Sequence, residues 1–315
     1  MTPDPRRLLF QRSGRNPILT AADWPYTVNS VFNPGAVRLV DGTTLLLCRV
    51  EDRTGVSHLC VARSADGVGG WQIDPEPTLR PDPCRPEEVW GIEDPRITWV
   101  EELERYAVVY TAYSPAGPAV ALALTRDFRE FERLGAVMTP EDKDAALLPR
   151  RINGRWLMVH RPTTGAEANI YISESPDLIH WGRHHLALAH RQGPWWDTSR
   201  VGLASPPIET AAGWLMLYHG VKNTAAGCLY RVGLALFDLE EPWRCRRRGA
   251  EWVMGPIEPY ERSGDVSDVV FPCGHTLGED GDRLNVYYGA ADSCIGLAST
   301  RVSALLAWLE RHSTE

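Results

Sequence analysis

One segment recurs five times along this chain, and its period restricts the folds that the chain can adopt. Each copy begins near a proline and continues into apolar runs of strand length. The five prolines are Pro34, Pro95, Pro149, Pro207 and Pro272, at intervals of 61, 54, 58 and 65 residues. Repetition at this period, with many short apolar runs, is typical of radial β-architectures in which each copy forms one sheet.

Turn signals divide each copy into several short apolar segments. Asp41-Gly42 and Asn153-Gly154 are dipeptides that favour tight hairpins between strands. Nearly every copy ends in an aromatic residue, and these residues are Trp71, Phe131, Trp181, Trp243 and Trp308. We therefore predict an all-β fold, a five-bladed β-propeller, in which the closing aromatics pack between blades.

The five copies follow one another without a polar, Pro/Ser-rich linker, which indicates a single domain over residues 1–315. The predicted blades are approximately 30–71, 91–135, 142–184, 201–249 and 269–308. Apolar residues at helical spacing predict a short closing helix within Arg301–His312. We expect the first thirty residues to wrap the outside or to complete the last blade.

Composition excludes some classes of function. The net charge of −8 argues against a general nucleic-acid binder, because such a protein needs a basic face. The N-terminus does not resemble a secretory signal and no apolar run reaches membrane-spanning length, so we expect a cytoplasmic protein without membrane partners. The seven cysteines form no CxxC pair, and we expect them to be reduced. We predict no metal and no organic cofactor.

The predicted fold brings particular positions together. Residues just before the repeated proline and residues just after the second strand of a blade converge at one end of the axis. These positions are occupied by Asn33, Asp94, Ser205, Arg49, Glu51, Tyr113, His160, Arg161, Tyr218, His219 and Asp292. They are almost all polar or aromatic, whereas the strands are apolar, so the sequence predicts a binding site at this end.

Several short motifs, in a fixed order, resemble glycoside hydrolase family 130. They are Asn33-Pro34-Gly35, Arg49-Val50-Glu51, Gly91-Ile92-Glu93-Asp94-Pro95-Arg96, Lys143-Asp144, His160-Arg161-Pro162, Tyr218-His219-Gly220 and Tyr288-Gly289-Ala290-Ala291-Asp292. The resemblance covers about residues 29–300. It implies a five-bladed β-propeller and membership of a family of mannoside phosphorylases and related β-mannosidases.

The resemblance also implies roles for individual residues. Asp94 matches the catalytic acid, which passes its proton to the glycosidic oxygen through the 3-hydroxyl of the mannose. Phosphate is already an anionic nucleophile, so the reaction needs a cationic binding site in place of a second carboxylate. The positions that match phosphate binding are Lys143, Arg161, Arg200 and His219. The expected substrate-binding residues are Asn33, Arg49, Glu51, Glu93, Tyr113, His160, Tyr218 and Asp292.

The predicted function is therefore that of an inverting β-mannoside phosphorylase that yields α-mannose 1-phosphate. A β-mannosidase that uses water is the nearest alternative, with Glu51, Asp144 or Glu258 as its base. A non-catalytic sugar-binding propeller is another. An arabinanase-like enzyme is disfavoured, because Ala145-Ala146 stand where its third-blade carboxylate should be. Linkage and acceptor sugar stay open, and a homo-oligomer is possible.

Simpler structural roles compete at several of these positions. Asp94-Pro95 could form only a turn, and Arg161 could belong to a structural ion pair. His219 could be a buried core histidine. The Trp195-Trp196 pair could stack on a sugar or simply pack its loop.

Overall fold

The protein is described from a computed structural model, which covers residues 9–165, 167–225 and 227–314. Two four-stranded antiparallel sheets come first. One contains β3 (Ser30–Arg38), β4 (Thr44–Glu51), β5 (Ser57–Ser64) and β6 (Gln72–Ile73) in that order. The second contains β7 (Ile92–Val100), β8 (Arg105–Ser114), β9 (Gly117–Thr125) and β10 (Glu132–Ala136).

The third and fourth copies of the repeat share one sheet. The third copy supplies β11 (Asp142–Leu147), β12 (Trp156–Thr164), β14 (Ile170–Ser175) and β15 (Gly182–Leu188). The fourth supplies β16 (Arg200–Leu203), β17 (Ile208–Thr210), β18 (Gly213–Thr224), β19 (Gly227–Phe237) and β20 (Cys245–Arg248). The short β13 (Glu167–Ala168) joins the two copies, because it pairs with β12 on one side and with β16 on the other.

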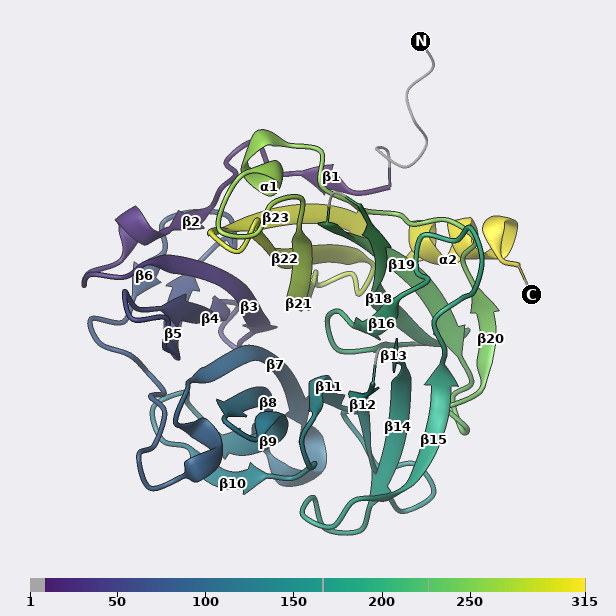
Figure 1. Cartoon of the computed structure of the whole chain (residues 1–315), viewed down its shortest axis with the longest axis horizontal. Helices are drawn as coiled ribbons and strands as arrows, with labels where there is room; N and C mark the ends of the chain where they lie inside the picture. Colours follow the sequence, from purple (N-terminus) through teal and green to yellow (C-terminus); the bar gives the residue numbers. More distant parts are fainter. Residues whose placement is uncertain (1–8, 166, 226, 315) are drawn as a thin grey trace.

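The last sheet combines both ends of the chain. It contains β21 (Val270–Leu277), β22 (Arg283–Ala290) and β23 (Cys294–Arg301), and β23 also pairs with β1 (Gln11–Arg12) and β2 (Leu19–Thr20). The N-terminal segment therefore completes the last sheet, as one of the two expected arrangements. Figure 1 shows the sheets arranged around the middle of the molecule, with β3, β7, β11, β16 and β21 nearest to it.

Helices are few and short. The predicted closing helix is confirmed as α2 (Val302–His312), which packs beside β19, β20 and β23. Among the described residues, the other helical segments are α1 (Pro259–Arg262) and the 3₁₀ turns η2 (Ala21–Asp23), η3 (Pro86–Glu88) and η4 (Glu101–Leu103). The prediction of an all-β fold is confirmed. No helix in the described ranges combines the length and apolar character that a membrane crossing requires.

The hydrophobic core lies between neighbouring sheets. Four clusters of buried apolar side chains each join two consecutive copies, and a fifth joins the last sheet to the first. Each cluster includes the aromatic that closes one copy. Trp71, for example, meets Tyr287 of the last sheet edge to face, with ring centroids 6.3 Å apart. The closing aromatics therefore pack between sheets, as predicted.

Candidate active site

Three successive inner strands carry the same irregularity at the centre of the molecule. Strands β3, β7 and β11 shift register against their partners around Asn33, Asp94 and Asp144. These residues have φ angles of 45°, 50° and 53°, in the left-handed region that Asn and Asp tolerate better than most residues. Such β-bulges turn a side chain away from the direction that the regular alternation along a strand would give it. All three residues are buried, and Figure 1 shows their strands β3, β7 and β11 nearest to the middle of the molecule.

The Arg49 guanidinium interacts with the carboxyl groups of one half of the site, here called the acidic group, which contains Glu93, Asp94 and Asp292. Its Nη1 donates a hydrogen bond to Oδ1 of Asp94 (3.1 Å), and its Nη2 donates to Oε1 of Glu93 (3.0 Å). Its Nε donates to Oγ of Ser57 (2.9 Å), so the plane of the guanidinium is fixed. Asn33 Nδ2 donates to the same Asp94 oxygen at 2.9 Å. Asp94, which is 2% exposed, is thus held by two donors from the neighbouring sheet.

The carboxyl groups around Arg49 differ in proton affinity. Burial alone would raise the pKa of Asp94, but the positive charges of Arg49 and Lys143 outweigh it and hold this pKa below its usual value. Burial raises the pKa of Glu93, although Arg49 opposes the shift. Burial and the charge of Asp94 raise the pKa of Asp292 to about 6. In the free protein a proton therefore binds Asp292 or Glu93 before it binds Asp94.

A second, mostly basic group lies beside the acidic group and contains Lys143, Asp144, Arg161 and His219. Asp144 Oδ2 accepts a hydrogen bond from Arg161 Nε (2.7 Å) and lies 3.4 Å from His219 Nε2. These three side chains are buried. Burial would raise the pKa of Asp144, but the charge of Arg161 holds it well below its usual range. The positive charge of Lys143 lowers the pKa of both Asp94 and His219, so it acts on both groups.

His219 is neutral in this environment. Burial lowers its pKa to about 3, against the attraction of Asp144. Its Nδ1 is buried and has no hydrogen-bond partner among the described residues. A Cβ on Gly202 would lie 2.5 Å from His219 Cε1 and 2.6 Å from Asp144 Oδ2, so only glycine leaves room for this pair. The neutral ring can offer one N–H to an anion.

Sequence reasoning missed Arg96, which contacts members of both groups. It is 1% exposed, and it donates to the backbone oxygens of Asp94 (3.0 Å), Leu203 (2.9 Å) and Ala204 (3.0 Å). It also lies 3.5 Å from Asp144. The arginine that ends the Glu93-Asp94-Pro95-Arg96 motif was the available signal. Its contacts fix the backbone of Asp94 against the fourth copy of the repeat.

Two predicted substrate-binding residues face away from these groups. Both ring nitrogens of His160 are engaged, with Asp142 Oδ2 at 2.5 Å and Ser173 Oγ at 2.7 Å. Tyr218 is fully buried, and its hydroxyl donates to Asp197 Oδ2 at 2.9 Å. Because side chains alternate along a strand, Arg161 and His219 reach the site while the residues before them point to the other face. The structure therefore argues against direct sugar contacts from His160 and Tyr218.

Other predicted residues also lie outside the two groups. The Arg200 guanidinium contacts Cys228 Sγ at 3.9 Å, and no described contact joins it to Asp144 or Arg161. Glu258 caps α1. Glu51 lies 3.7 Å from Arg49, at the edge of the acidic group. Tyr113 is exposed at the end of β8.

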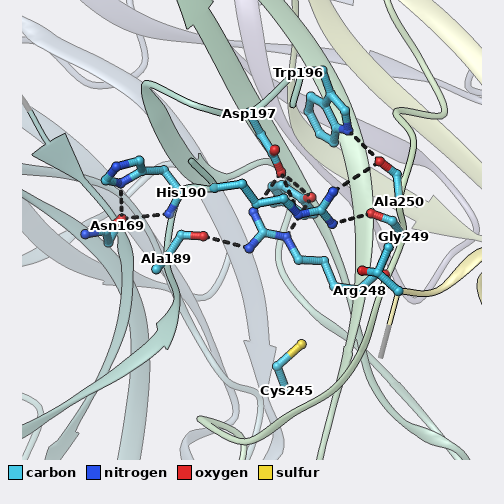
Figure 2. Close-up of polar contacts among 12 residues, drawn as sticks. Asn169, Ala189, His190, Trp196, Asp197, Cys245, Arg248, Gly249 and Ala250 are labelled. Atoms are coloured by element: carbon cyan, nitrogen blue, oxygen red, sulfur yellow. Dashed lines mark hydrogen bonds and ion pairs between the residues drawn. The ribbon is translucent and has the colours of Figure 1, made fainter. Parts of the chain in front are cut away.

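The loop of Trp195 and Trp196 is fixed by a buried ion pair. Figure 2 shows the contacts around Asp197, whose Oδ2 accepts a hydrogen bond from Arg248 Nη2 at 2.7 Å. Trp196 Nε1 donates to the backbone oxygen of Ala250 (3.2 Å), and its ring stacks on Tyr218. Trp196, at 7% exposure, is therefore a packing residue, which settles the open alternative for this tryptophan.

Comparisons with known proteins agree over almost the whole chain. The model of glycoside hydrolase family 130, described as beta-1,4-mannooligosaccharide phosphorylase, matches residues 11–311. A beta-1,4-mannooligosaccharide phosphorylase of Ruminococcus albus is 33% identical over 314 residues, which is 96% of this chain and 91% of that protein. A beta-1,2-mannobiose phosphorylase of Listeria innocua is 38% identical over 82% of this chain and 70% of that protein.

A solved structure is also similar. The beta-1,2-mannobiose phosphorylase of Listeria innocua, in complex with beta-1,2-mannobiose, superposes with a TM-score of 0.87 at 32% identity. The superposition covers 96% of this chain and 99% of that one. Fold and sequence thus lead to the same group of proteins.

Proposed function

The chain belongs to glycoside hydrolase family 130, and from this membership we propose that it is a β-mannoside phosphorylase. It transfers a terminal β-mannosyl unit to inorganic phosphate. The observation that carries the proposal is the juxtaposition of one hydrogen-bonded carboxyl group, Asp94, with the basic groups of Lys143, Arg161 and His219.

The reaction is a single displacement with inversion. A phosphate oxygen attacks the anomeric carbon while the bond from that carbon to the glycosidic oxygen breaks. The electron pair of this bond stays on the leaving oxygen, and that oxygen takes the proton of Asp94, relayed by the 3-hydroxyl of the mannosyl unit. The products are α-mannose 1-phosphate and the shortened saccharide.

The proton on Asp94 depends on phosphate. In the free protein Lys143 and Arg49 lower the pKa of Asp94, which favours the ionised form. A bound phosphate dianion would offset the charges of Lys143 and Arg161, so we expect this pKa to rise when phosphate binds. Asp94 is then protonated in the phosphate complex, in which it acts as the acid.

The phosphate site consists of Lys143, Arg161 and His219. Asp144 holds Arg161 through Nε, which leaves the two Nη groups for bidentate contact with an anion. Lys143 adds a point charge, and neutral His219 adds one N–H. Arg200 was predicted to join them, but its contact with Cys228 gives this role no support.

Phosphorolysis fits the site better than hydrolysis does. A hydrolase needs a carboxylate base opposite the acid. Asp144 is ion-paired and its pKa lies well below the usual range, so it is a poor base, and Glu258 caps a helix. Asn33, Arg49, Glu93 and Asp292 surround Asp94 and would bind the mannosyl hydroxyls.

We further propose that the sheets form the five blades of a β-propeller. Five consecutive inter-sheet cores, the last of which joins the final sheet to the first, support this arrangement. The joined third and fourth sheets would then count as two blades that share an edge contact through β13.

Incubation with β-1,2- and β-1,4-mannobiose, with and without phosphate, tests the function. We expect mannose 1-phosphate only when phosphate is present. D94N should lose on the order of 10²–10⁴ in kcat on mannobiose. It should lose much less on a dinitrophenyl β-mannoside, whose leaving group needs no proton. D268N, which changes a half-exposed aspartate, serves as the control. Free mannose released without phosphate would refute the proposal.

A further inference from the structure

Two aromatic side chains are exposed at one end of the second sheet. Trp90 is 48% exposed and Tyr113 is 37% exposed. Their ring centroids lie 5.5 Å apart, and the planes meet at 66°. The pair, here called the aromatic corner, therefore presents two faces at a steep angle to each other. Large exposed aromatics that lie together commonly mark a binding surface.

The aromatic corner lies at the same end of the sheet as the acidic group. Trp90 N donates to the backbone oxygen of Tyr113 (2.9 Å), and Tyr113 N donates to that of Gly91 (3.0 Å). Trp90 is four residues before Asp94, so their Cα atoms are at most about 13 Å apart. Gly91 also bridges to Ser57, the residue that accepts from Arg49. The corner is thus continuous with the proposed sugar site.

The loop that carries Trp90 is firmly held. Glu88 is fully buried two residues earlier, where it accepts from the Tyr110 hydroxyl (2.8 Å) and from Asp82 N (2.9 Å). It also pairs with Arg133. A buried carboxylate with several donors fixes the backbone around it. The exposed indole therefore stands on a pre-organised loop, which lowers the entropic cost of binding a ligand there.

We propose that the aromatic corner binds sugar units on the leaving-group side of the cleaved bond. This inference rests on the proposed function. A pyranose ring has apolar C–H faces that pack on an aromatic ring, and two rings at 66° contact a sugar on two sides. The ligand class is a β-mannooligosaccharide with at least one unit beyond the mannosyl donor. Trisaccharides and longer chains should be better substrates than disaccharides.

A chain-length series tests the corner. Phosphorolysis of mannobiose, mannotriose and mannotetraose, in the linkage that the parent cleaves, is measured at saturating phosphate for the parent, W90A and W90F. W90A should lower kcat/KM on mannotriose roughly three- to tenfold, with a smaller effect on mannobiose. The KM for phosphate should not change, and W90F should retain most of the activity. V89A alters an equally exposed neighbour in the same loop and serves as the control.

Binding of mannotriose to the same variants is measured by calorimetry, so the corner is judged even if turnover fails. An inactive parent that binds mannotriose more tightly than W90A would refute the function but support the corner. Equal losses on all chain lengths, or unchanged mannotriose affinity in W90A, would refute the corner. A change in the oligomeric state of W90A with unchanged affinity would identify the two rings as a subunit interface and would also refute it.

Discussion

Asp292 is a single residue of the site whose burial lowers the stability of the folded protein at neutral pH. Burial and the nearby charge of Asp94 raise its pKa to about 6, whereas an unfolded chain leaves it near 3.8. Between these values the folded state binds more protons than the unfolded state. Stability conferred by this residue is therefore greatest at low pH and falls as the pH rises through about 6.

We predict that D292N is more heat-stable than the parent at pH 8, because the amide removes an unfavourable buried charge. The gain in Tm should shrink towards pH 4.5, where the parent carboxyl is protonated when folded. Phosphorolysis by D292N should fall if this residue binds the sugar. Thermal unfolding of both proteins at the two pH values measures the difference, with D268N, at a half-exposed aspartate, as the control. The same Tm difference at both pH values would contradict the raised pKa.

At the level of the strand, alternation decides which motif residues reach the site. His160-Arg161 and Tyr218-His219 are consecutive pairs, and in a strand only one residue of such a pair can face the centre. The sequence motifs identified the pairs but not the register, so both members were predicted to reach the site, Arg161 and His219 to bind phosphate and His160 and Tyr218 to bind the sugar. The structure directs Arg161 and His219 inward, and it engages His160 with Asp142 and Ser173.

The bulges were equally invisible in the sequence. Asn33, Asp94 and Asp144 owe their direction to register shifts against the next strand, and a register shift depends on the partner strand as well as on the residue. The repeat and its turn dipeptides were enough to predict the strands. The directions in which these side chains point depended on contacts between strands, which the local sequence pattern does not show.

Strand β22 approaches the first bulge so closely that it needs a glycine. A Cβ on Gly289 would lie 1.9 Å from Asn33 Oδ1 and 2.8 Å from Asn33 N. We predict that G289A displaces Asn33 from Asp94 and lowers kcat/KM on mannobiose about tenfold or more, with a loss of roughly 1–3 kcal/mol in stability. A Cβ on Gly182 would have no other atom within 4 Å, so G182A is the matched control. Unchanged activity in a folded G289A would show that the Asn33 contact is dispensable.

At the level of the whole molecule, the repeat and the closing aromatics predicted the sheets and their packing. Four of the five clusters join copies that are neighbours along the chain, so the local pattern was sufficient for them. The link through β13 was not predicted, because two residues carry no readable periodicity. The pairing of the N-terminal strands with β23 was only one of two options, since their shortness gives little pattern.

The junction of the two chain ends depends on a buried ion pair. Arg12 Nε lies 3.0 Å from Glu261 Oε1, and its Nη2 donates to Gly255 O at 2.8 Å. Glu261 is fully buried and also accepts from the Tyr288 hydroxyl (2.8 Å) and from the backbone N–H of Ile257 (2.7 Å). Loss of Arg12 alone would leave a buried carboxylate without its counter-charge.

We predict that R12M lowers the free energy of unfolding by about 3–5 kcal/mol, because it leaves Glu261 uncompensated. The double variant R12M/E261Q removes both charges, and the amide oxygen can still accept from Ile257 N–H while the amide N–H₂ donates to the Tyr288 hydroxyl oxygen. Its loss should therefore be smaller than the sum of the two single losses, by on the order of 1–3 kcal/mol. Denaturant unfolding of the four proteins measures this coupling, and kcat/KM at 25 °C should be unchanged because the pair lies outside the site. Additive losses would show that Arg12 and Glu261 act independently, and the ion pair would then have no part in joining the chain ends.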